Sequence, residues 1–335
     1  MPTPRALGFR MPAEWEPHSR TWMMWPRRAE VWPDMDATRR AYAAVAHAIR
    51  RFEPLTMVVH PQDRAGAASL LGADIELLDW PIDDSWSRDA GPNFVTDGAG
   101  NTAAALFRFN AWGGKYAPYD GDASAGRHMA EQAGVRCFQS ALVAEGGGVS
   151  VDGAGTVLTT RSCFPNRNRN PGWTEAQIEA ELKQMLGADK VIWLPGNADE
   201  VETDGHVDGI AVFAAPGVVL VEGADDPRDP WRAIKQANID ALRGMTDAQG
   251  RPLRLVEMPE ADPSCAIGDR FCLSYVNAYL CNGAVIMPRY GIARDDAVRE
   301  LYADTFPNAE IVGVDITAIA IGGGGIHCIT QQEPA

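Results

Sequence analysis

Residues 321–332, IGGGGIHCITQQ, place one cysteine three positions after a run of four glycines. Glycine has no Cβ, so this backbone can adopt conformations and close approaches that other residues forbid. The apolar run before the glycines predicts a strand that ends in a loop, where a side chain can face a small ligand. We therefore expect Cys328 to be a nucleophile. The alternative is an ordinary turn with Cys328 as a small buried apolar residue, so a nucleophile requires partners elsewhere.

Two acidic residues stand beside turn-forming glycines and are candidate partners. In DDSWSRDAGPNF, residues 83–94, Asp89 comes just before a Gly-Pro turn and follows Trp86 and Arg88. In AEGGGVSVDG, Glu145 precedes three glycines. A structural alternative exists for each: Arg88 could form an ion pair with a carboxylate, and Glu145 could simply mark the junction of a strand and a turn.

His206 and Asp208, in ETDGHVDGIAVF, form the third cluster. We expect them at the start of an apolar strand, where side chains two residues apart lie on one face. A histidine beside a carboxylate can act as a base next to a cationic substrate. The alternative is a histidine that satisfies its hydrogen bonds in the core.

Helices and strands mix along the chain in an α+β pattern, without the G-x-G-x-x-G of a dinucleotide-binding fold. Asn-Gly at 282–283 predicts a hairpin between two β-rich runs. The block at 11–26 reads as an irregular or strand-like stretch that is buried or faces a pocket, and NRNRN at 166–170 reads as a solvated loop. Apolar spacing predicts helices at 36–52, 62–71, 122–133, 174–186 (capped by Thr174) and 229–243, and strands at 55–59, 75–78, 191–194, 217–222 and 253–258.

Composition limits the classes of function. The 335 residues carry a formal net charge of −15, which disfavours nucleic acid or an anionic membrane as a partner and mildly favours a cationic substrate. No segment is long and apolar enough to span a bilayer, and the first residues lack the apolar core of a secretion signal, so we expect a cytoplasmic protein. The six cysteines contain no C-x-x-C pair, which argues against structural zinc and a disulfide framework.

The candidate residues recur at regular intervals. Glu145 lies 56 residues after Asp89, His206 lies 61 after Glu145, and Cys328 lies 122 after His206. Such spacing would follow if equivalent turns of repeated modules faced one axis.

Seven segments in this order resemble the agmatine deiminase family: PAEWEPH, WSRDAGP, FNAWGGKY, EGGG, GHVD, SYVNAYLCNGAVIMP and IHCITQQ. The resemblance runs from about residue 11 to 332. It implies the pentein fold, an α+β fold of five ββαβ-like modules around a pseudo-fivefold axis, and therefore a single catalytic domain over residues 1–335. It also implies hydrolysis of agmatine to N-carbamoylputrescine and ammonia without a metal or an organic cofactor.

The resemblance also implies roles for five residues. Cys328 matches the nucleophile and His206 the general acid and base. Asp89 and Asp208 match the carboxylates that hold the guanidinium group, and Glu145 matches the acid that orients and charges the histidine. A thiolate suits attack on a guanidinium carbon, because two carboxylates can localise its delocalised charge as a tetrahedral centre forms.

Trp86 and Trp112 match residues that line the substrate pocket. The sequence departs from the family pattern at Gly325 and Gly209, where the family has asparagine, which leaves the exact guanidino substrate open. His327 is a rival base, but we expect it to face away from Cys328 if the segment is extended.

Three other functions are compatible with parts of the sequence. A pentein amidinotransferase would use the same nucleophile but transfer the amidino group to an amine. A silent pentein would only bind a partner or ligand, and a metal-dependent ureohydrolase would use His206 and the aspartates as ligands. A homo-oligomer is compatible with the sequence, which does not fix the oligomeric state.

Overall fold

The computed structural model describes residues 2–335, which form a mixed α+β fold with small sheets. The described strands form five sheets. Four of them have three strands: β4(Asn93–Thr96), β5(Thr102–Arg108) and β6(Arg136–Val143); β7(Ser150–Val151), β8(Thr156–Thr160) and β9(Lys190–Leu194); β10(Ala211–Ala215), β11(Val218–Glu222) and β12(Arg254–Met258); β13(Tyr279–Cys281), β14(Ala284–Arg289) and β15(Glu310–Asp315).

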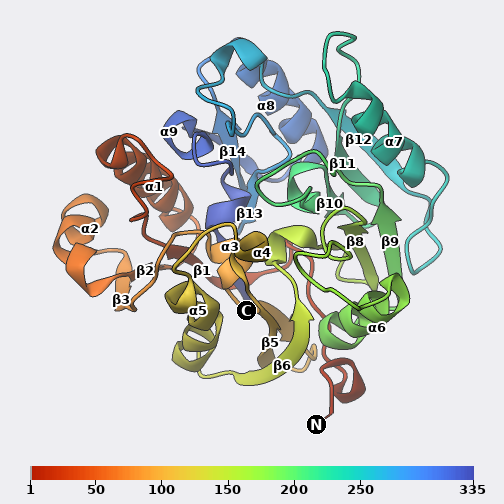
Figure 1. Cartoon of the computed structure of the whole chain (residues 1–335), viewed down its shortest axis with the longest axis horizontal. Coiled ribbons are helices and arrows are strands. Elements are labelled where there is room, and N and C mark those ends of the chain that lie inside the picture. The colour runs from red at the N-terminus through yellow and green to blue at the C-terminus, as the bar shows by residue number, and fades with distance from the viewer. Residues whose placement is uncertain (1) are drawn as a thin grey trace.

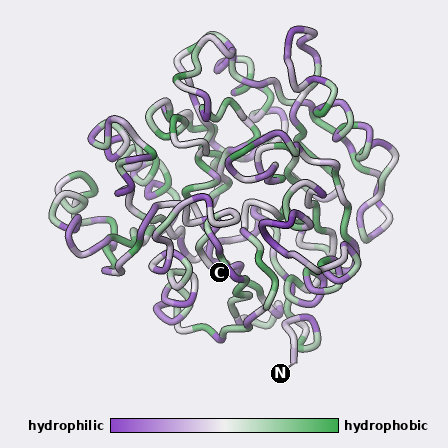
Figure 2. Tube along the Cα trace, in the orientation of Figure 1, coloured by the Kyte–Doolittle hydropathy of each residue, from purple (hydrophilic) through white to green (hydrophobic). Residues whose placement is uncertain are grey.

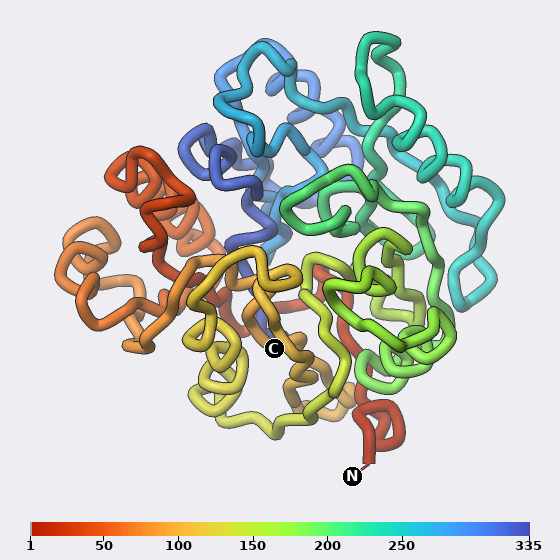
Figure 3. Tube along the Cα trace, in the orientation of Figure 1, coloured from red at the N-terminus to blue at the C-terminus, as the bar shows by residue number. Residues whose placement is uncertain are grey.

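The fifth sheet joins the two ends of the chain. Its order is β16(Gln331–Pro334), β1(His18–Met24), β2(Leu55–Val59) and β3(Glu76–Asp79). Strand β16 pairs antiparallel with β1, with Trp22 opposite Gln331. The last strand, blue in Figure 3, thus lies against the first strand, in red. This pairing holds the segment that follows Cys328 in place.

All five sheets repeat one pattern of strand directions. In each, one strand has an antiparallel neighbour on one side and a parallel neighbour on the other, as in β4–β5–β6 and β10–β11–β12. Parallel neighbours need a long crossover, and a helix supplies it. These crossover helices lie at the periphery of the molecule in Figure 1: α1(Met35–Arg50), α2(Arg64–Leu71), α5(Asp120–Gln132), α6(Glu175–Leu186), α7(Arg232–Leu242) and α8(Arg294–Thr305).

Short helical turns connect the longer elements. Helices α3(Ser87–Ala90) and α4(Ala111–Gly114) lie near the centre of Figure 1, and α9(Thr317–Ala320) precedes the four glycines. The described 3₁₀ turns are η1(Arg5–Leu7), η2(Pro61–Asp63), η3(Gly146–Gly148), η4(Val207–Gly209), η5(Pro263–Cys265) and η6(His327–Ile329).

Most of the predicted elements are confirmed. Thr174 caps α6 with a capping box, and the Asn-Gly hairpin joins β13 to β14 with Gly283 at φ 76°. The block at 11–26 contains β1 and buries Trp22 and Trp25. Figure 2 shows apolar strands inside and polar stretches on the outer helices. No described helix combines the length and apolar character needed to cross a bilayer.

Three local predictions were wrong. A short helix, α9, precedes the glycines where we expected a strand. His206 precedes the turn η4 and Asp208 lies in it, whereas the strand β10 begins only at Ala211. The tract NRNRN is not simply a solvated loop, because Arg169 and Asn170 are buried. In all three segments, tertiary contacts override the local preference.

Candidate active site

The structure brings the four sequence clusters together. The Nδ1 atom of His206 lies 3.7 Å from Asp89 Oδ1, and its Nε2 atom lies 3.4 Å from Glu145 Oε2. The thiol of Cys328 lies 3.6 Å from Asp208 Oδ2. All five side chains are buried, although they come from segments up to 239 residues apart.

Turns, and not strand ends, position these groups. Asp89 is in α3, Glu145 immediately precedes η3, Asp208 is in η4 and Cys328 is in η6. A short turn lets the chain place a polar side chain at the centre while the flanking strands remain in their sheets. The predicted shared strand face of His206 and Asp208 was therefore wrong, but both side chains still point to one place.

Gly147 is the point where the groups converge. A Cβ at this position would lie 2.6 Å from His206 Nδ1 and 2.9 Å from both Asp208 Oδ2 and Asp89 Oδ1. The Gly147 amide donates a 3.0 Å hydrogen bond to Asp89 Oδ1. The absence of a side chain here leaves the space in which the acids and the imidazole meet.

The environment of His206 favours the imidazolium form. Burial acts to lower its pKa, but the carboxylate of Asp89 and the hydrogen bond to Glu145 outweigh it and raise the pKa well above the usual range. Its Nδ1 atom is buried without a hydrogen-bond partner. This proton therefore remains available to a bound molecule.

Arg169 is a site residue that sequence reasoning missed. Its Nε atom donates a 2.6 Å hydrogen bond to Glu145 Oε1, and both side chains are fully buried. Burial acts to raise the pKa of Glu145, but the charge of Arg169 prevails and the pKa is lowered. Glu145 thus stays charged beside His206. A polar tract rich in asparagine gives no local signal for such burial.

His327 faces the site, so its predicted orientation was wrong. It lies in the turn η6 and not in an extended segment, so adjacent side chains do not alternate. Its Nδ1 atom lies 2.8 Å from Asp208 Oδ2 and its Nε2 atom 2.7 Å from Glu14 Oε1. Burial and the charge of Arg88 both act to lower its pKa, but the two carboxylates raise it above the usual value.

Arg88 is fully buried, as the structural alternative proposed, but it does not pair with Asp89. Its Nη1 atom lies 3.6 Å from Glu14 Oε1. Its Nε atom donates to the backbone oxygen of His327 at 3.4 Å. Arg88 and His327 are thus two cationic groups close to Asp208.

The environment of Cys328 favours the neutral thiol. Burial, followed by the charges of Asp208 and Asp89, raises its pKa well above the usual value. Its other polar neighbour is Asn277, whose Oδ1 atom lies 3.4 Å from both Sγ and the Cys328 amide nitrogen. A Cβ at Gly325 would lie 2.5 Å from the same oxygen. The glycine at 325 therefore gives room to Asn277.

A narrow cavity of about 30 Å³ ends at Asp89 and Cys328. The two predicted wall residues, Trp86 and Trp112, both line it, and Trp112 Nε1 donates a 2.9 Å hydrogen bond to Asp89 Oδ2. Toward the rim it is lined by Tyr116, whose hydroxyl donates to the Glu202 carboxylate. None of the residues that line this cavity is a lysine or an arginine. The cavity therefore suits a slender cation.

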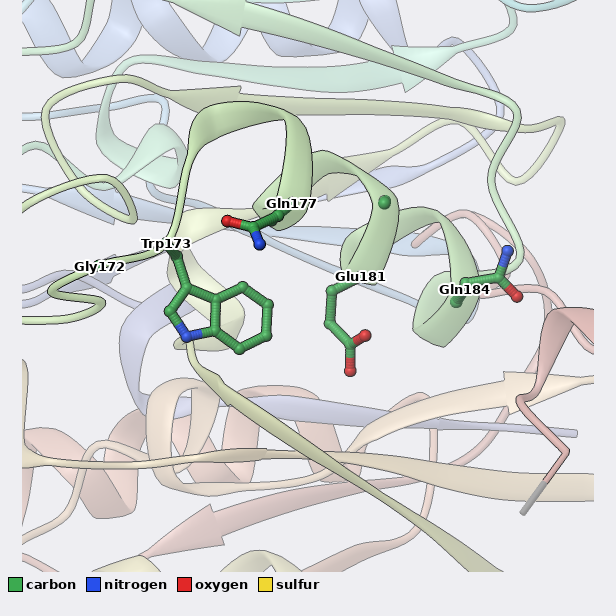
Figure 4. A pocket seen from close by; sticks show the side chains of 6 residues that line it. Gly172, Trp173, Gln177, Glu181 and Gln184 are labelled. Carbon is green, nitrogen blue, oxygen red and sulfur yellow. The ribbon is translucent and has the colours of Figure 1, made fainter.

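A second hollow lies on the outer face of α6 (Figure 4). Its volume is about 310 Å³, and Trp173, Gln177, Glu181 and Gln184 line it. It contains none of the clustered acids, the histidines or Cys328. This hollow therefore takes no part in the site chemistry.

Comparison with known proteins gives consistent matches over the whole chain. The family model described as Porphyromonas-type peptidyl-arginine deiminase matches residues 10–334. A Streptomyces coelicolor protein is 44% identical over 337 residues, covering 98% of this chain and 99% of that protein. The agmatine deiminase of Stutzerimonas stutzeri is 41% identical, covering 99% and 97%. The solved agmatine deiminase of Enterococcus faecalis superposes with a TM-score of 0.96 at 36% identity, covering 100% and 98%.

Proposed function

The chain belongs to the agmatine deiminases of the Porphyromonas-type peptidyl-arginine deiminase family, and from this membership we propose that it hydrolyses agmatine to N-carbamoylputrescine and ammonia. The observation that carries the proposal is the convergence of Asp89, Glu145, His206 and Asp208 beside the thiol of Cys328. Hydrolysis of a guanidinium requires three parts: carboxylates that hold the cation, a group that acts as acid and base, and a nucleophile.

In the first step, the carboxylates of Asp89 and Asp208 bind the guanidinium group, which lies between Trp86 and Trp112. Burial, together with the carboxylates of Asp208 and Asp89, raises the pKa of the Cys328 thiol. A bound cation neutralises these carboxylates, so substrate binding favours the thiolate, and the thiol proton leaves to solvent. The nucleophile is therefore activated only when substrate is present.

In the second step, the thiolate attacks the guanidinium carbon and a C–S bond forms. The imidazolium of His206 donates its proton to the departing nitrogen as the C–N bond breaks, and ammonia leaves. The remaining covalent intermediate is a thiouronium on Cys328. Arg169 supports this step indirectly, because it keeps Glu145 ionised and Glu145 favours the charged form of His206.

In the third step, the neutral His206 takes a proton from water, which attacks the thiouronium carbon. The C–S bond breaks, the hydroxyl proton of the tetrahedral centre passes to the leaving sulfur, and the neutral ureido product is released from the Cys328 thiol. His206 is again an imidazolium. One residue thus serves as acid in the first half-reaction and base in the second.

The cavity lining supports agmatine as the substrate over free arginine. Glu202 near the rim can receive the terminal ammonium of agmatine, whereas no lysine or arginine among the lining residues could receive the carboxylate of arginine. A buried carboxylate without a partner is unfavourable by several kcal/mol. Arg270 lies outside this lining and contacts Glu202 and Tyr116, so the preference for a decarboxylated substrate rests on the lining residues themselves.

We also propose that the five sheets are the five modules of a pseudo-fivefold pentein propeller forming one catalytic domain over residues 1–335. The repeated strand pattern and the pairing of β16 with β1 support this arrangement. A cytoplasmic location is part of the proposal, because all six cysteines, each within residues 2–335, are free thiols.

The decisive experiment is a substrate panel of agmatine, free arginine, peptidyl-arginine and shorter guanidino compounds. Ammonia and the ureido product would be measured with and without added amines. We expect equal amounts of ammonia and N-carbamoylputrescine from agmatine. Transfer of the amidino group to the amine without ammonia would instead identify an amidinotransferase, and loss of activity on chelation with recovery by manganese would identify a ureohydrolase.

A further inference from the structure

Cys163 is a buried thiol that the proposed reaction does not use. It lies just beyond β8 and is fully buried. Its Sγ atom lies 3.9 Å from Glu145 Oε2, on the side of Glu145 that faces His206. Cys328 contacts a different carboxylate, that of Asp208. The site therefore contains a second sulfur atom beside its acid–base pair.

The three side chains have the separations of a metal site. Glu145 Oε2 lies 3.4 Å from His206 Nε2 and 3.9 Å from Cys163 Sγ, and the three ligand atoms all lie within 4.8 Å of one another. Tetrahedral zinc with bonds of about 2.0 to 2.3 Å requires ligand atoms roughly 3.3 to 3.7 Å apart. Only small side-chain movements separate the present arrangement from coordination.

The remaining contacts leave these atoms available. Arg169 bonds to the other carboxylate oxygen, Glu145 Oε1, so Oε2 can still act as a ligand. The Arg169 bond also fixes the carboxylate, as outer partners of metal ligands commonly do. A set of one sulfur, one imidazole nitrogen and one carboxylate oxygen suits Zn²⁺ and not Mg²⁺ or Ca²⁺.

We propose that Cys163, His206 and Glu145 form an inhibitory site for zinc-like divalent cations. Coordination releases the proton of the Cys163 thiol and one proton of the His206 imidazolium to solvent. The bound cation then prevents His206 from donating or accepting a proton, and its charge repels the guanidinium group from Asp89. The inhibition rests on the proposed deiminase function, whereas binding of the cation does not.

Cobalt spectroscopy tests binding independently of catalysis. The probe is Co²⁺ added to the full-length Cys328→Ser protein, which lacks the nucleophilic sulfur. We expect a sulfur-to-cobalt charge-transfer band with one cobalt per chain, and its loss in Cys163→Ser/Cys328→Ser. A band that disappears in Cys328→Ser but persists in Cys163→Ser would overturn the proposal, because the ion would then bind the nucleophile. Absence of binding at millimolar Co²⁺ and Zn²⁺ would overturn it as well.

Zinc inhibition provides the second measurement. Cys163→Ala is compared with Cys281→Ala, a matched change of another buried cysteine that lies on β13. We expect Zn²⁺ to inhibit wild type and Cys281→Ala equally, with recovery on chelation, and Cys163→Ala to require at least about tenfold more Zn²⁺. Equal sensitivity of both variants would refute the site. If no variant has deiminase activity, the proposed function fails, while the cobalt measurement still decides whether the metal site exists.

Discussion

The chemistry of the site depends on a few pairs of residues from distant parts of the chain. Asp208 contacts both His327 and the thiol of Cys328, and Glu145 contacts both Arg169 and His206. Each carboxylate thus has one cationic partner that fixes it and one partner that takes part in the reaction. The cationic partners determine how much negative charge remains for the substrate.

At the residue scale, replacing Cys328 by alanine should abolish turnover, because the covalent intermediate cannot form. The measurement is the ammonia release rate with agmatine, with circular dichroism to confirm the fold and Cys281→Ala as the control. Residual activity above about one thousandth of wild type, a barrier change of only ~4 kcal/mol, would contradict the assignment.

Arg169→Met should destabilise the protein by about 3 to 5 kcal/mol, because Glu145 loses its buried counter-charge. Without that charge the pKa of Glu145 should rise, so His206 should lose its imidazolium proton at lower pH. The measurements are denaturant unfolding and the pH profile of kcat/KM. The control is Arg167→Met, an exposed change in the same tract, which should alter neither the unfolding free energy nor the pH profile. A loss of unfolding free energy below about 1 kcal/mol in Arg169→Met would show that the fold does not depend on the Arg169–Glu145 ion pair.

At the element scale, the turn η3 leaves no room for extra atoms at Gly147. Gly147→Ala should lower kcat/KM at least about a hundredfold with the fold retained, because displacement of catalytic groups by about 1 Å is enough for such a loss. Gly209→Ala is the matched control, since a Cβ there has no atom within 4 Å. Equal kcat/KM values for the two variants would mean that the acids and the imidazole can move apart without loss of activity.

Glu14 connects the segment before β1 to the turn η6 through His327. Burial acts to raise the pKa of Glu14, but His327 and Arg88 outweigh it and lower the pKa to about 2. Because the folded-state pKa lies below the unfolded value, this contact stabilises the protein above about pH 4.5, and the contribution disappears as the pH falls toward 2.

Comparison of wild type with Glu14→Gln measures this contribution. The difference in unfolding free energy should be at most about 3 kcal/mol near pH 5 and should shrink as the pH falls toward 2. The exposed Glu30→Gln serves as the control. A difference that stays constant over this range would show that Glu14 acts by packing and not by its charge.

At the scale of the whole molecule, an acidic protein encloses a cavity whose lining has carboxylates but no lysine or arginine. Agmatine should therefore exceed free arginine in kcat/KM by at least about a hundredfold. Glu202→Gln should lower kcat/KM for agmatine and reduce the ratio of kcat/KM for agmatine to that for arginine. The control is Asp199→Asn, an exposed change in the same loop, which should leave kcat/KM for agmatine and this ratio unchanged. Similar kcat/KM values for the two substrates in wild type would refute the charge argument.

The sequence by itself determined the elements whose signals are local. The apolar spacing of the outer helices, the Thr174 cap and the Asn-Gly hairpin depend on neighbours a few residues away, so the helices and hairpin were predictable. The candidate acids, His206 and Cys328 were found because they stand beside glycines and within recognisable motifs. Their catalytic roles remain predictions.

Only the tertiary structure decided which polar groups are buried together. Arg169 stands in a tract that resembles a surface loop, and His327 was expected to point away from Cys328. Both are buried because carboxylates from distant segments, Glu145 for Arg169 and Asp208 for His327, are present to neutralise them. Burial of a charge is favourable only with such a partner, and the partner lies 24 residues away in one case and 119 in the other. Local sequence does not contain that information.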